Sequence, residues 1–343
     1  MVVHNPTTTP LMIRRFSYPL LLLLGGALTA LATSQEIISR HLDATAGGKL
    51  VVDVDFGTVE VTGSGTDSKS VTIKAQRIVE IMDKVREKEF VAAAPITITQ
   101  ENNVITVRAR SDREWTWNDD HKRMEARYTV QVPNNFTADL HTGGGAINVT
   151  DLTGKVQANT AGGRLNFNRV HGSTDGKTSG GAVSLIDCDG ALKIETAGGK
   201  IIARGGKGTL DAETAGGHMA IRNFAGQVDI ASNGGQLILN QITGPITAKT
   251  GGGQINATLS TATDVKLETN AGAISVAIPS NAGFDVDAQS GIGGVSTDLP
   301  VSGDRNSRQA LIGALNGGGK KLFLRTGAGH ISINSASGER ASR

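Results

Sequence analysis

Apolar and polar residues alternate in short runs along most of the chain. One set of runs carries the pairs Ile147/Val149, Leu165/Phe167, Val183/Leu185, Ile201/Ala203, Met219/Ile221, Leu237/Leu239 and Ile255/Ala257. Between these runs lie the pairs Val156/Ala158, Leu192/Ile194, Leu210/Ala212, Val228/Ile230 and Ile246/Ala248. Since successive side chains of a strand point to opposite faces, this pattern predicts many strands of about five residues with one buried face.

The predicted strands are separated by a pattern that recurs every 18 residues. Its hydroxyl column consists of Thr142, Thr160, Thr178, Thr196, Thr214, Ser232 and Thr250. Two and three positions later come the glycine pairs Gly144-Gly145, Gly162-Gly163, Gly180-Gly181, Gly198-Gly199, Gly216-Gly217, Gly234-Gly235 and Gly252-Gly253. We expect both glycines of each pair at tight corners, where φ is positive or where backbones leave no room for a Cβ.

A short repeat of this kind predicts a solenoid. One unit cannot bury its apolar face alone, but a stack of similar units can. Parallel pairing spaces coils by about 4.8 Å, so about ten coils would form a rod near 50 Å long. We therefore predict an all-β protein built on a parallel β-solenoid of about 18 residues per coil over residues 139–335, followed by a disordered tail at 336–343.

Residues 33–138 carry a less regular pattern. Alternating runs such as Leu50 to Val54 and Tyr128 to Val132 predict further strands, and one helix is expected at about 77–94, ending before Pro95. We interpret this segment as a β-rich N-terminal region that caps the open edge of the first coil.

The first 32 residues have the pattern of a secretory signal peptide. Arg14 and Arg15 precede an apolar stretch from Tyr18 to Leu31, and the small residues Ala30 and Ala32 lead to an expected cleavage after Ala32. An uncleaved anchor is the alternative, although the stretch is short for a membrane span. We expect export to the periplasm, the cell surface or the medium, and no transmembrane segment after cleavage.

Composition and charge narrow the classes of partner. Glycine accounts for 45 of 343 residues, whereas Pro is only 8, which excludes collagen. Without the leader the chain has 32 basic (34 − 2) and 32 acidic residues, so neither nucleic acid nor anionic lipid is an expected partner. The lone Cys188 excludes an internal disulfide, and its column also holds Leu152, Val170, Phe224 and Ile242, which predicts a buried thiol.

Motifs for nucleotides and metals are incomplete. The segment Gly172 to Thr178 has three residues between its glycines, whereas a phosphate-binding loop needs four. The positions after the glycine pairs hold Asn148, Asn166, Ser184 and Asn256 where a calcium loop would place Asp. We expect no nucleotide, no metal and no cofactor, and we interpret the Thr column as a structural ladder.

Carboxylates one coil apart are the best candidates for catalysis. Glu195 and Glu213, and Asp211 and Asp229, are each 18 residues apart and should lie about 5 Å apart, near the spacing of a retaining glycosidase pair. The other interpretation is a solvated face on which lysines such as Lys177, Lys193 and Lys249 offset the acids.

Both tryptophans fall in one polar segment. Arg113, Trp115 and Trp117 have the composition of a binding anchor, although the two indoles could equally pack on the end of the solenoid.

The repeat resembles a known bacterial domain. Leu140-x-Thr142-x-Gly144-x-Ala146-Ile147-x-Val149 after Pro133, and Thr326-Gly327-Ala328-Gly329-His330-Ile331-Ser332-Ile333 near the end, are similar to the putative-adhesin domain of unknown function. The resemblance covers about residues 45–334 and implies the fold, with no catalytic residues to transfer. We expect an exported, non-enzymatic binding or display module whose partner is a protein or glycan of the cell envelope. A polysaccharide-cleaving solenoid enzyme and a structural assembly scaffold are the alternatives.

Overall fold

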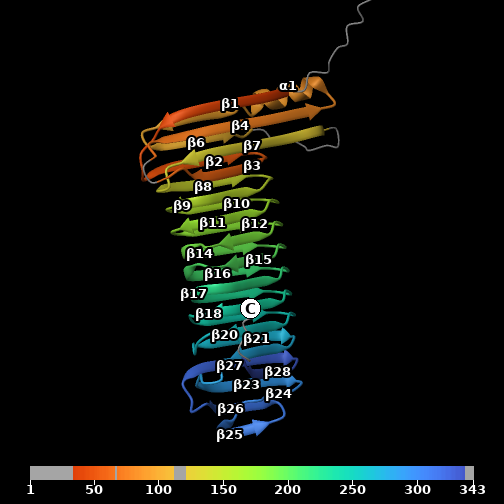
Figure 1. Ribbon diagram of the computed structural model, residues 1–343. Coiled ribbons are helices and arrows are strands. Elements are labelled where there is room, and N and C mark those ends of the chain that lie inside the picture. The colour runs from red at the N-terminus through yellow and green to blue at the C-terminus, as the bar shows by residue number, and fades with distance from the viewer. Residues whose placement is uncertain (1–33, 66–67, 112–120, 337–343) are drawn as a thin grey trace, which may run out of the picture. The chain divides into compact units, whose positions relative to one another are not determined.

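The chain is all-β, with a β-solenoid-like stack of strands (Figure 1). The computed structural model describes residues 34–65, 68–111 and 121–336, which belong to one compact unit. Within these residues there is a single helix, α1 (Lys84–Ala93). The predicted all-β fold class is therefore confirmed.

Two columns of parallel strands form the middle of the stack. The first contains β8 (Phe136–Thr142), β10 (Val156–Thr160), β12 (Thr174–Thr178), β14 (Asp189–Thr196), β16 (Lys207–Thr214), β19 (Ile246–Thr250) and β21 (Val265–Ala271). The second contains β9 (Ile147–Thr153), β11 (Leu165–His171), β13 (Val183–Ile186), β15 (Ile201–Arg204), β18 (Leu237–Ile242), β20 (Ile255–Leu259) and β22 (Ile274–Ile278). The long strand β17 (Met219–Ser232) contributes its first half to the second column and its second half to the first.

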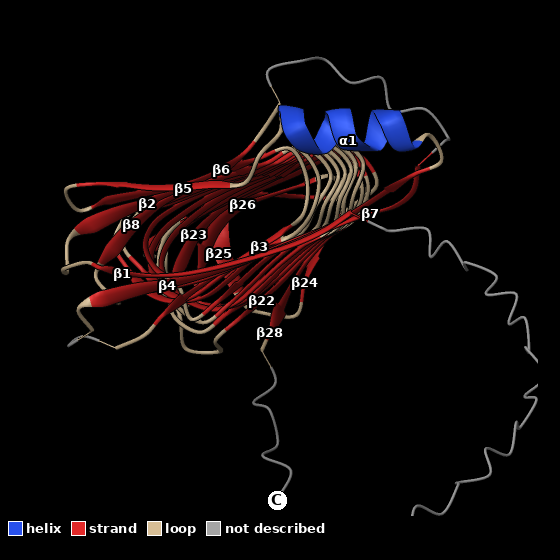
Figure 2. Ribbon diagram, turned by 90° about the horizontal axis from the view of Figure 1, so that it is seen from above, coloured by secondary structure: helices blue, strands red, loops and turns tan. Residues whose placement is uncertain are grey.

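Strands within a column pair in register with residues one repeat away. Val156 pairs with Thr174, and Leu165 pairs with Val183, each 18 positions on. Seen from above, the strands of successive coils superpose and their connecting loops line up (Figure 2). A sequence column is therefore also a column in space, with neighbours about 4.8 Å apart.

Both columns bury their inward side chains in one shared core. Buried residues alternate with more exposed ones along these strands, strictly so in β8 and β10, and the buried apolar side chains form a single hydrophobic cluster along the stack. The outward side chains of the two columns consequently lie on different faces of the protein.

The second column ends in a sharp bend that the sequence analysis did not anticipate. Non-glycine residues adopt φ between 52° and 58° there, namely Asp151, Arg169, Asp187, Asn223 and Gln241. Asn and Asp tolerate this left-handed region better than most side chains. The bend turns the chain so that the next apolar residue, such as Leu152 or Val170, still reaches the core.

At the N-terminal end the coils are not stacked in sequence order. The elements here are β1 (Ser34–Asp43), β2 (Gly48–Val54), β3 (Thr58–Gly63), β4 (Ser70–Ile81), β5 (Thr97–Glu101), β6 (Val104–Ala109) and β7 (His121–Val132). β2 pairs in parallel with both β6 and β8, and β3 pairs in parallel with both β7 and β9. β4 and β1 then extend the second column in antiparallel fashion, and β5 extends the first.

The C-terminal end repeats this inversion. Its elements are β23 (Phe284–Ile292), β24 (Val295–Thr297), β25 (Val301–Ser307), β26 (Ala310–Leu315), β27 (Lys320–Ala328) and β28 (Ile331–Ser335). The last coil, β27 and β28, lies between β21/β22 on one side and β23/β24 on the other. β26 and β25 close the first column with antiparallel pairs.

The helix is shorter than predicted. Residues 77–81 belong to β4, where Arg77, Val79 and Ile81 are buried and alternate with less buried neighbours, and Val85 is 66 % exposed. Ile81, Val85 and Phe90 have helical spacing, but residues 77–81 form a strand because β4 pairs with β1 on one side and β7 on the other. In this strand every second side chain is buried. α1 begins only after Asp83, whose carboxylate accepts hydrogen bonds from the backbone N–H groups of Val85 (2.8 Å) and Arg86 (3.3 Å).

Candidate functional site

The hydroxyl column forms a buried ladder that connects neighbouring coils. Thr160 Oγ1 donates to the carbonyl oxygen of Gly145 at 2.9 Å and accepts from the N–H of Gly163 at 3.1 Å. The same two hydrogen bonds recur in each following coil, at Thr178, Thr196, Thr214, Ser232 and Thr250. Thr142, at the first corner, donates to the carbonyl oxygens of Gly57 and Gly144 at 3.2 Å. These hydroxyls are engaged by the backbone, so their chemistry is structural.

The two glycines of each pair have different surroundings. A Cβ on Gly163 would lie 1.6 Å from the carbonyl oxygen of Gly145. At Gly145, Gly181, Gly199, Gly217, Gly235 and Gly253 the corresponding distance to a carbonyl oxygen of the adjacent coil is between 1.8 and 2.2 Å. At the first positions a Cβ would meet nothing within 4 Å and φ is not positive, as found for Gly144, Gly162, Gly180, Gly198, Gly216, Gly234 and Gly252. The expectation that both glycines are sterically required is therefore wrong for the first of each pair, which faces open space.

An open groove runs beside this ladder. One part, of about 780 Å³, extends from His141 to Asn233 and has Lys177, Glu195 and Glu213 along it. A second part, of about 580 Å³, shares Ala231 and Asn233 with the first and continues to Gly327. Small exposed residues follow the corner side of the groove, including Ala161, Ser179, Ala197 and Ala215. The groove therefore follows the stacking direction over many coils.

Glu195 and Glu213 lie in this groove as in-register neighbours. Glu195 is bonded to Lys177 at 3.0 Å and to Lys193 at 3.2 Å, and the hydrogen bond from Lys177 holds its pKa below the usual range. Among the described residues, Glu213 has no hydrogen-bond or ion-pair partner. A general acid of a glycosidase needs a raised pKa, and Glu195 has the opposite.

Asp211 and Asp229 are also in-register neighbours, but they do not line the groove. Both are exposed and lie in the neighbouring outward column of the same face. The structure thus brings together each predicted carboxylate pair and separates the two pairs by column. Lys249 offsets another acid, Glu268, at 3.6 Å further along the groove.

Cys188 lies in the core. Its side chain is 1 % exposed, burial raises the pKa of the thiol, and the Sγ donates to the carbonyl oxygen of Ile186 at 3.4 Å. Its predicted column neighbours Leu152, Val170, Phe224 and Ile242 are also buried. Metal binding has no evident site in residues 34–65, 68–111 and 121–336, which contain no suitable group of three His, Cys, Asp or Glu side chains.

Part of the chain matches a known family of domains. Residues 208–334 match the family described as Toastrack DUF4097. The resemblance to an adhesin-type domain of unknown function is confirmed. No curated protein matches the sequence significantly.

Several solved structures are similar to this chain. A "putative adhesin" from Parabacteroides distasonis ATCC 8503 is 15 % identical, with a TM-score of 0.45, covering 70 % of this chain and 97 % of its own. A "putative adhesin" from Parabacteroides merdae ATCC 43184 is 13 % identical, with a TM-score of 0.37, covering 88 % and 97 %. A "putative lipid binding protein" from Parabacteroides distasonis ATCC 8503 is 12 % identical, with a TM-score of 0.35, covering 88 % and 97 %.

Several predicted features of the chain lie outside the described residues. These are the signal peptide at 1–32, the candidate anchor Arg113, Trp115 and Trp117, and all of the expected tail except Ala336. No helix in the part of the chain that the structure describes is long and apolar enough to cross a membrane.

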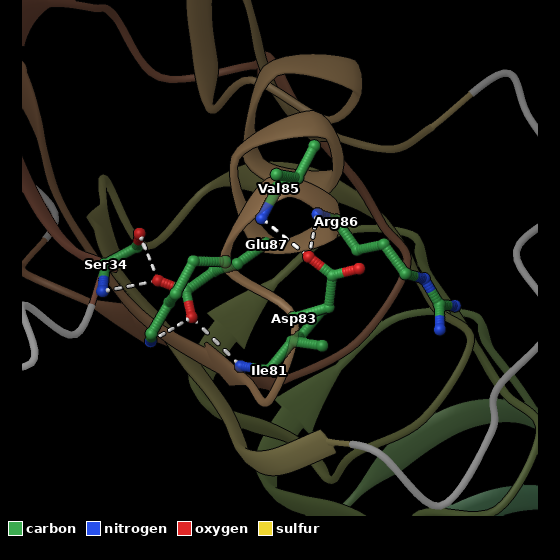
Figure 3. A network of polar contacts seen from close by, with 7 residues as sticks. Ser34, Ile81, Asp83, Val85, Arg86 and Glu87 are labelled. Carbon is green, nitrogen blue, oxygen red and sulfur yellow. Dashed lines mark hydrogen bonds and ion pairs between the residues drawn. The ribbon is translucent and has the colours of Figure 1, made fainter.

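A buried carboxylate near the N-terminal end was missed by sequence reasoning. Glu87 of α1 is 2 % exposed and accepts hydrogen bonds from Ser34 Oγ at 2.7 Å, Lys84 Nζ at 2.6 Å and the Ile81 N–H at 3.0 Å (Figure 3). Burial alone would raise the pKa of Glu87, but these hydrogen bonds outweigh it and lower the pKa to about 2. Glu87 thereby ties α1 to the start of β1. The only signal in the sequence was the spacing Asp83-x-x-x-Glu87 at a helix start.

A second hollow lies in the same region. It measures about 510 Å³ and is lined by residues of β3, β4 and β7 together with the first corner, among them Phe56, Met124, Arg127 and Gly145. Arg77, at 1 % exposure, borders it and donates through Nε to Glu36 at 2.7 Å and through Nη1 to the carbonyl oxygen of Ala94. The buried guanidinium is thus held between β1 and the end of α1.

Proposed function

We propose that this protein is an exported, non-enzymatic solenoid that binds or displays a ligand at the cell envelope. The observation that carries the proposal is the groove from His141 to Gly327, which two adjoining hollows form. A groove along the stacking direction suits an extended partner, such as a glycan chain or a protein segment, better than a compact small molecule. The charged residues along it are of both signs, so a mixed polar partner fits better than a strongly charged one.

Export is the part of the proposal supported by the N-terminal sequence. Arg14 and Arg15 followed by the apolar stretch to Leu31 have the order of a secretory leader. Fractionation of cells that express the full chain, followed by N-terminal sequencing, should find the protein outside the cytoplasm with Thr33 as its first residue. A cytoplasmic protein that begins at Met1 or Met12 would contradict export.

The non-enzymatic part is supported by the state of the carboxylates. Glu195 is neutralised by two lysines and has a lowered pKa, and Asp211 and Asp229 lie on an exposed face outside the groove. In an assay for new reducing ends on envelope polysaccharides, the native chain should release no more reducing ends than the Glu195→Gln/Glu213→Gln variant does. If the native chain releases reducing ends and this variant does not, the protein would instead be a polysaccharide-cleaving enzyme.

The groove itself can be tested by filling it. Ala197 and Ala215 are exposed in the groove, so Ala197→Trp/Ala215→Trp should block an extended partner without disturbing the core. Ala191 and Ala225 are exposed but do not line the groove, so Ala191→Trp/Ala225→Trp is the matched control. Binding of labelled protein to isolated envelopes should fall at least tenfold in the first variant alone. Equal binding by both variants and the native chain would reject the groove as the binding surface.

A further inference from the structure

Opposite charges generally face each other across neighbouring coils of this solenoid. Lys177 contacts Glu195 at 3.0 Å, Arg169 contacts Asp151 at 2.5 Å, and Lys207 contacts Asp189 at 3.9 Å. The partners in each of these pairs are 18 residues apart. In-register parallel pairing explains this arrangement, because residues directly opposite each other on one face interact and like charges there are destabilising.

Like charges are in-register neighbours in the middle of the stack, at Glu195 and Glu213 and at two further pairs in the coils of β15 to β17 (Figure 1). In the second column, Arg204 is the in-register neighbour of Arg222. In the first column of the same coils, Asp211 is the in-register neighbour of Asp229. All four side chains are exposed. Like charges are therefore stacked about 4.8 Å apart on both faces at the same height.

No counter-ion lies within ion-pair distance of these like charges among the described residues, although Lys193 interacts electrostatically with Asp211 from the neighbouring coil. None of the four makes an ion pair there. The outer neighbours of Arg204 and Arg222 in their column are Ile186 and Asn240. The outer neighbours of Asp211 and Asp229 are Lys193 and Thr247, and Lys193 is already bonded to Glu195 at 3.2 Å.

The surroundings of the arginines are suited to a protein surface. The strands β13, β15, β18 and the first half of β17 contain no acidic residue. Ile186 is 40 % exposed beside Arg204, and Ile202 and Ile238 are partly exposed in the adjacent outward column. We call this surface the arginine face, and the surface that carries Asp211 and Asp229 the aspartate face.

We propose that the arginine face of one molecule docks on the aspartate face of a second copy. Arg204 and Asp211 belong to one coil, and Arg222 and Asp229 belong to the next, so two copies side by side without axial offset bring each arginine to the height of an aspartate. A single contact relieves both repulsive stacks. A small anion would relieve only the arginines, and a small cation only the aspartates.

The geometry also determines the kind of assembly. Different faces meet, so each added copy leaves one arginine face and one aspartate face free, and the array can grow or close into a ring. Strands of about five residues over about six coils give roughly 500 Å² per partner, below the roughly 800 Å² of a stable interface. Association is therefore weak, dependent on concentration and sensitive to salt.

Sedimentation velocity tests the proposal. The full chain, purified as the cell processes it, should sediment faster as its concentration rises in about 20 mM salt, and as a monomer in about 500 mM salt. Arg204→Glu/Arg222→Glu alone and Asp211→Lys/Asp229→Lys alone should remain monomeric, and mixing the two should restore association. Restoration by mixing also shows that both variants are folded.

A matched control separates the faces from the change in net charge. Lys69→Glu/Lys88→Glu changes the charge by the same amount at exposed lysines before β4 and in α1, outside both columns, and it should associate like the native chain. A native chain that stays monomeric at every concentration in low salt would overturn the proposal. So would association that survives Arg204→Glu/Arg222→Glu, or that is lost equally in the lysine control.

Discussion

Gly199 lies so close to Gly181 of the preceding coil that a Cβ on Gly199 would be 1.9 Å from the Gly181 carbonyl oxygen. A Cβ on its chain neighbour Gly198 would have nothing within 4 Å. The two glycines thus form a matched pair for substitution by alanine. The added methyl group would clash with backbone at Gly199 and would face solvent at Gly198.

Gly199→Ala should therefore destabilise the protein, and Gly198→Ala should not. Displacing the neighbouring backbone costs about 3 kcal/mol, whereas the change at Gly198 should stay within about 0.5 kcal/mol. Urea unfolding of both variants measures the difference. Equal loss of stability in the two variants would mean that Gly198 is also required, for its backbone conformation.

The hydroxyl of Thr196 should matter more than its methyl group. Thr196→Val leaves the Gly181 carbonyl and the Gly199 N–H without their buried partner, at a cost of about 2 kcal/mol in the free energy of unfolding. Thr196→Ser keeps both hydrogen bonds, as Ser232 does at its own corner, and should cost less than half as much. Urea denaturation in which the Val variant is the more stable one would contradict the ladder.

Glu87 should make stability depend on acid pH. Its pKa is about 2 in the folded chain and 4.5 without the fold, so its contribution is complete above about pH 4.5 and is lost as the pH falls toward 2. Glu87→Gln should lower stability at pH 7 by about 2 kcal/mol and flatten the pH profile in that window. Glu89→Gln, an exposed change in the same helix, is the control and should alter neither. A Glu87→Gln profile as steep as the native one would refute this role.

The thiol of Cys188 should be unreactive in the folded protein. Burial removes reagent access and raises the pKa, so little thiolate forms at pH 8. A chromogenic disulfide reagent should label one thiol per chain in urea and almost none without it. Fast labelling of the native protein would show that this column opens to solvent.

The position of the last coil predicts an unusual truncation result. A chain that ends at residue 318 lacks β27 and β28, so β23 and β24 lose their parallel partners on the side facing β21 and β22. Limited proteolysis should then cut within residues 284–315, whereas a chain that lacks only 337–343 should resist. Protection of 284–315 in the shorter chain would mean that β23 can pair directly with β21.

The regular middle of the solenoid could be predicted because one local pattern recurs there in every coil. A helix at 77–94 could not be excluded from the sequence, because Ile81, Val85 and Phe90 have helical spacing. Only the structure shows that β1 and β7 pair with residues 77–81 and make them part of a strand. The carboxylate pairs were found because columns in sequence are columns in space. The ion pairs of Glu195 and the buried hydrogen bonds of Glu87 depend on side-chain directions and long-range contacts, which spacing does not contain.

By itself the sequence determined the repeat, the strand alternation and the hydroxyl-glycine corner, because parallel in-register stacking gives each equivalent position the same surroundings. Only the tertiary structure decided the order of the coils, with residues 48–63 inserted at one end and 320–335 at the other. Inward Val, Ile and Leu side chains pack equally well on any neighbouring coil, so local pattern does not specify which coil comes next. The excursions through β4 and α1, and through β25 and β26, provide the long connections that this order requires.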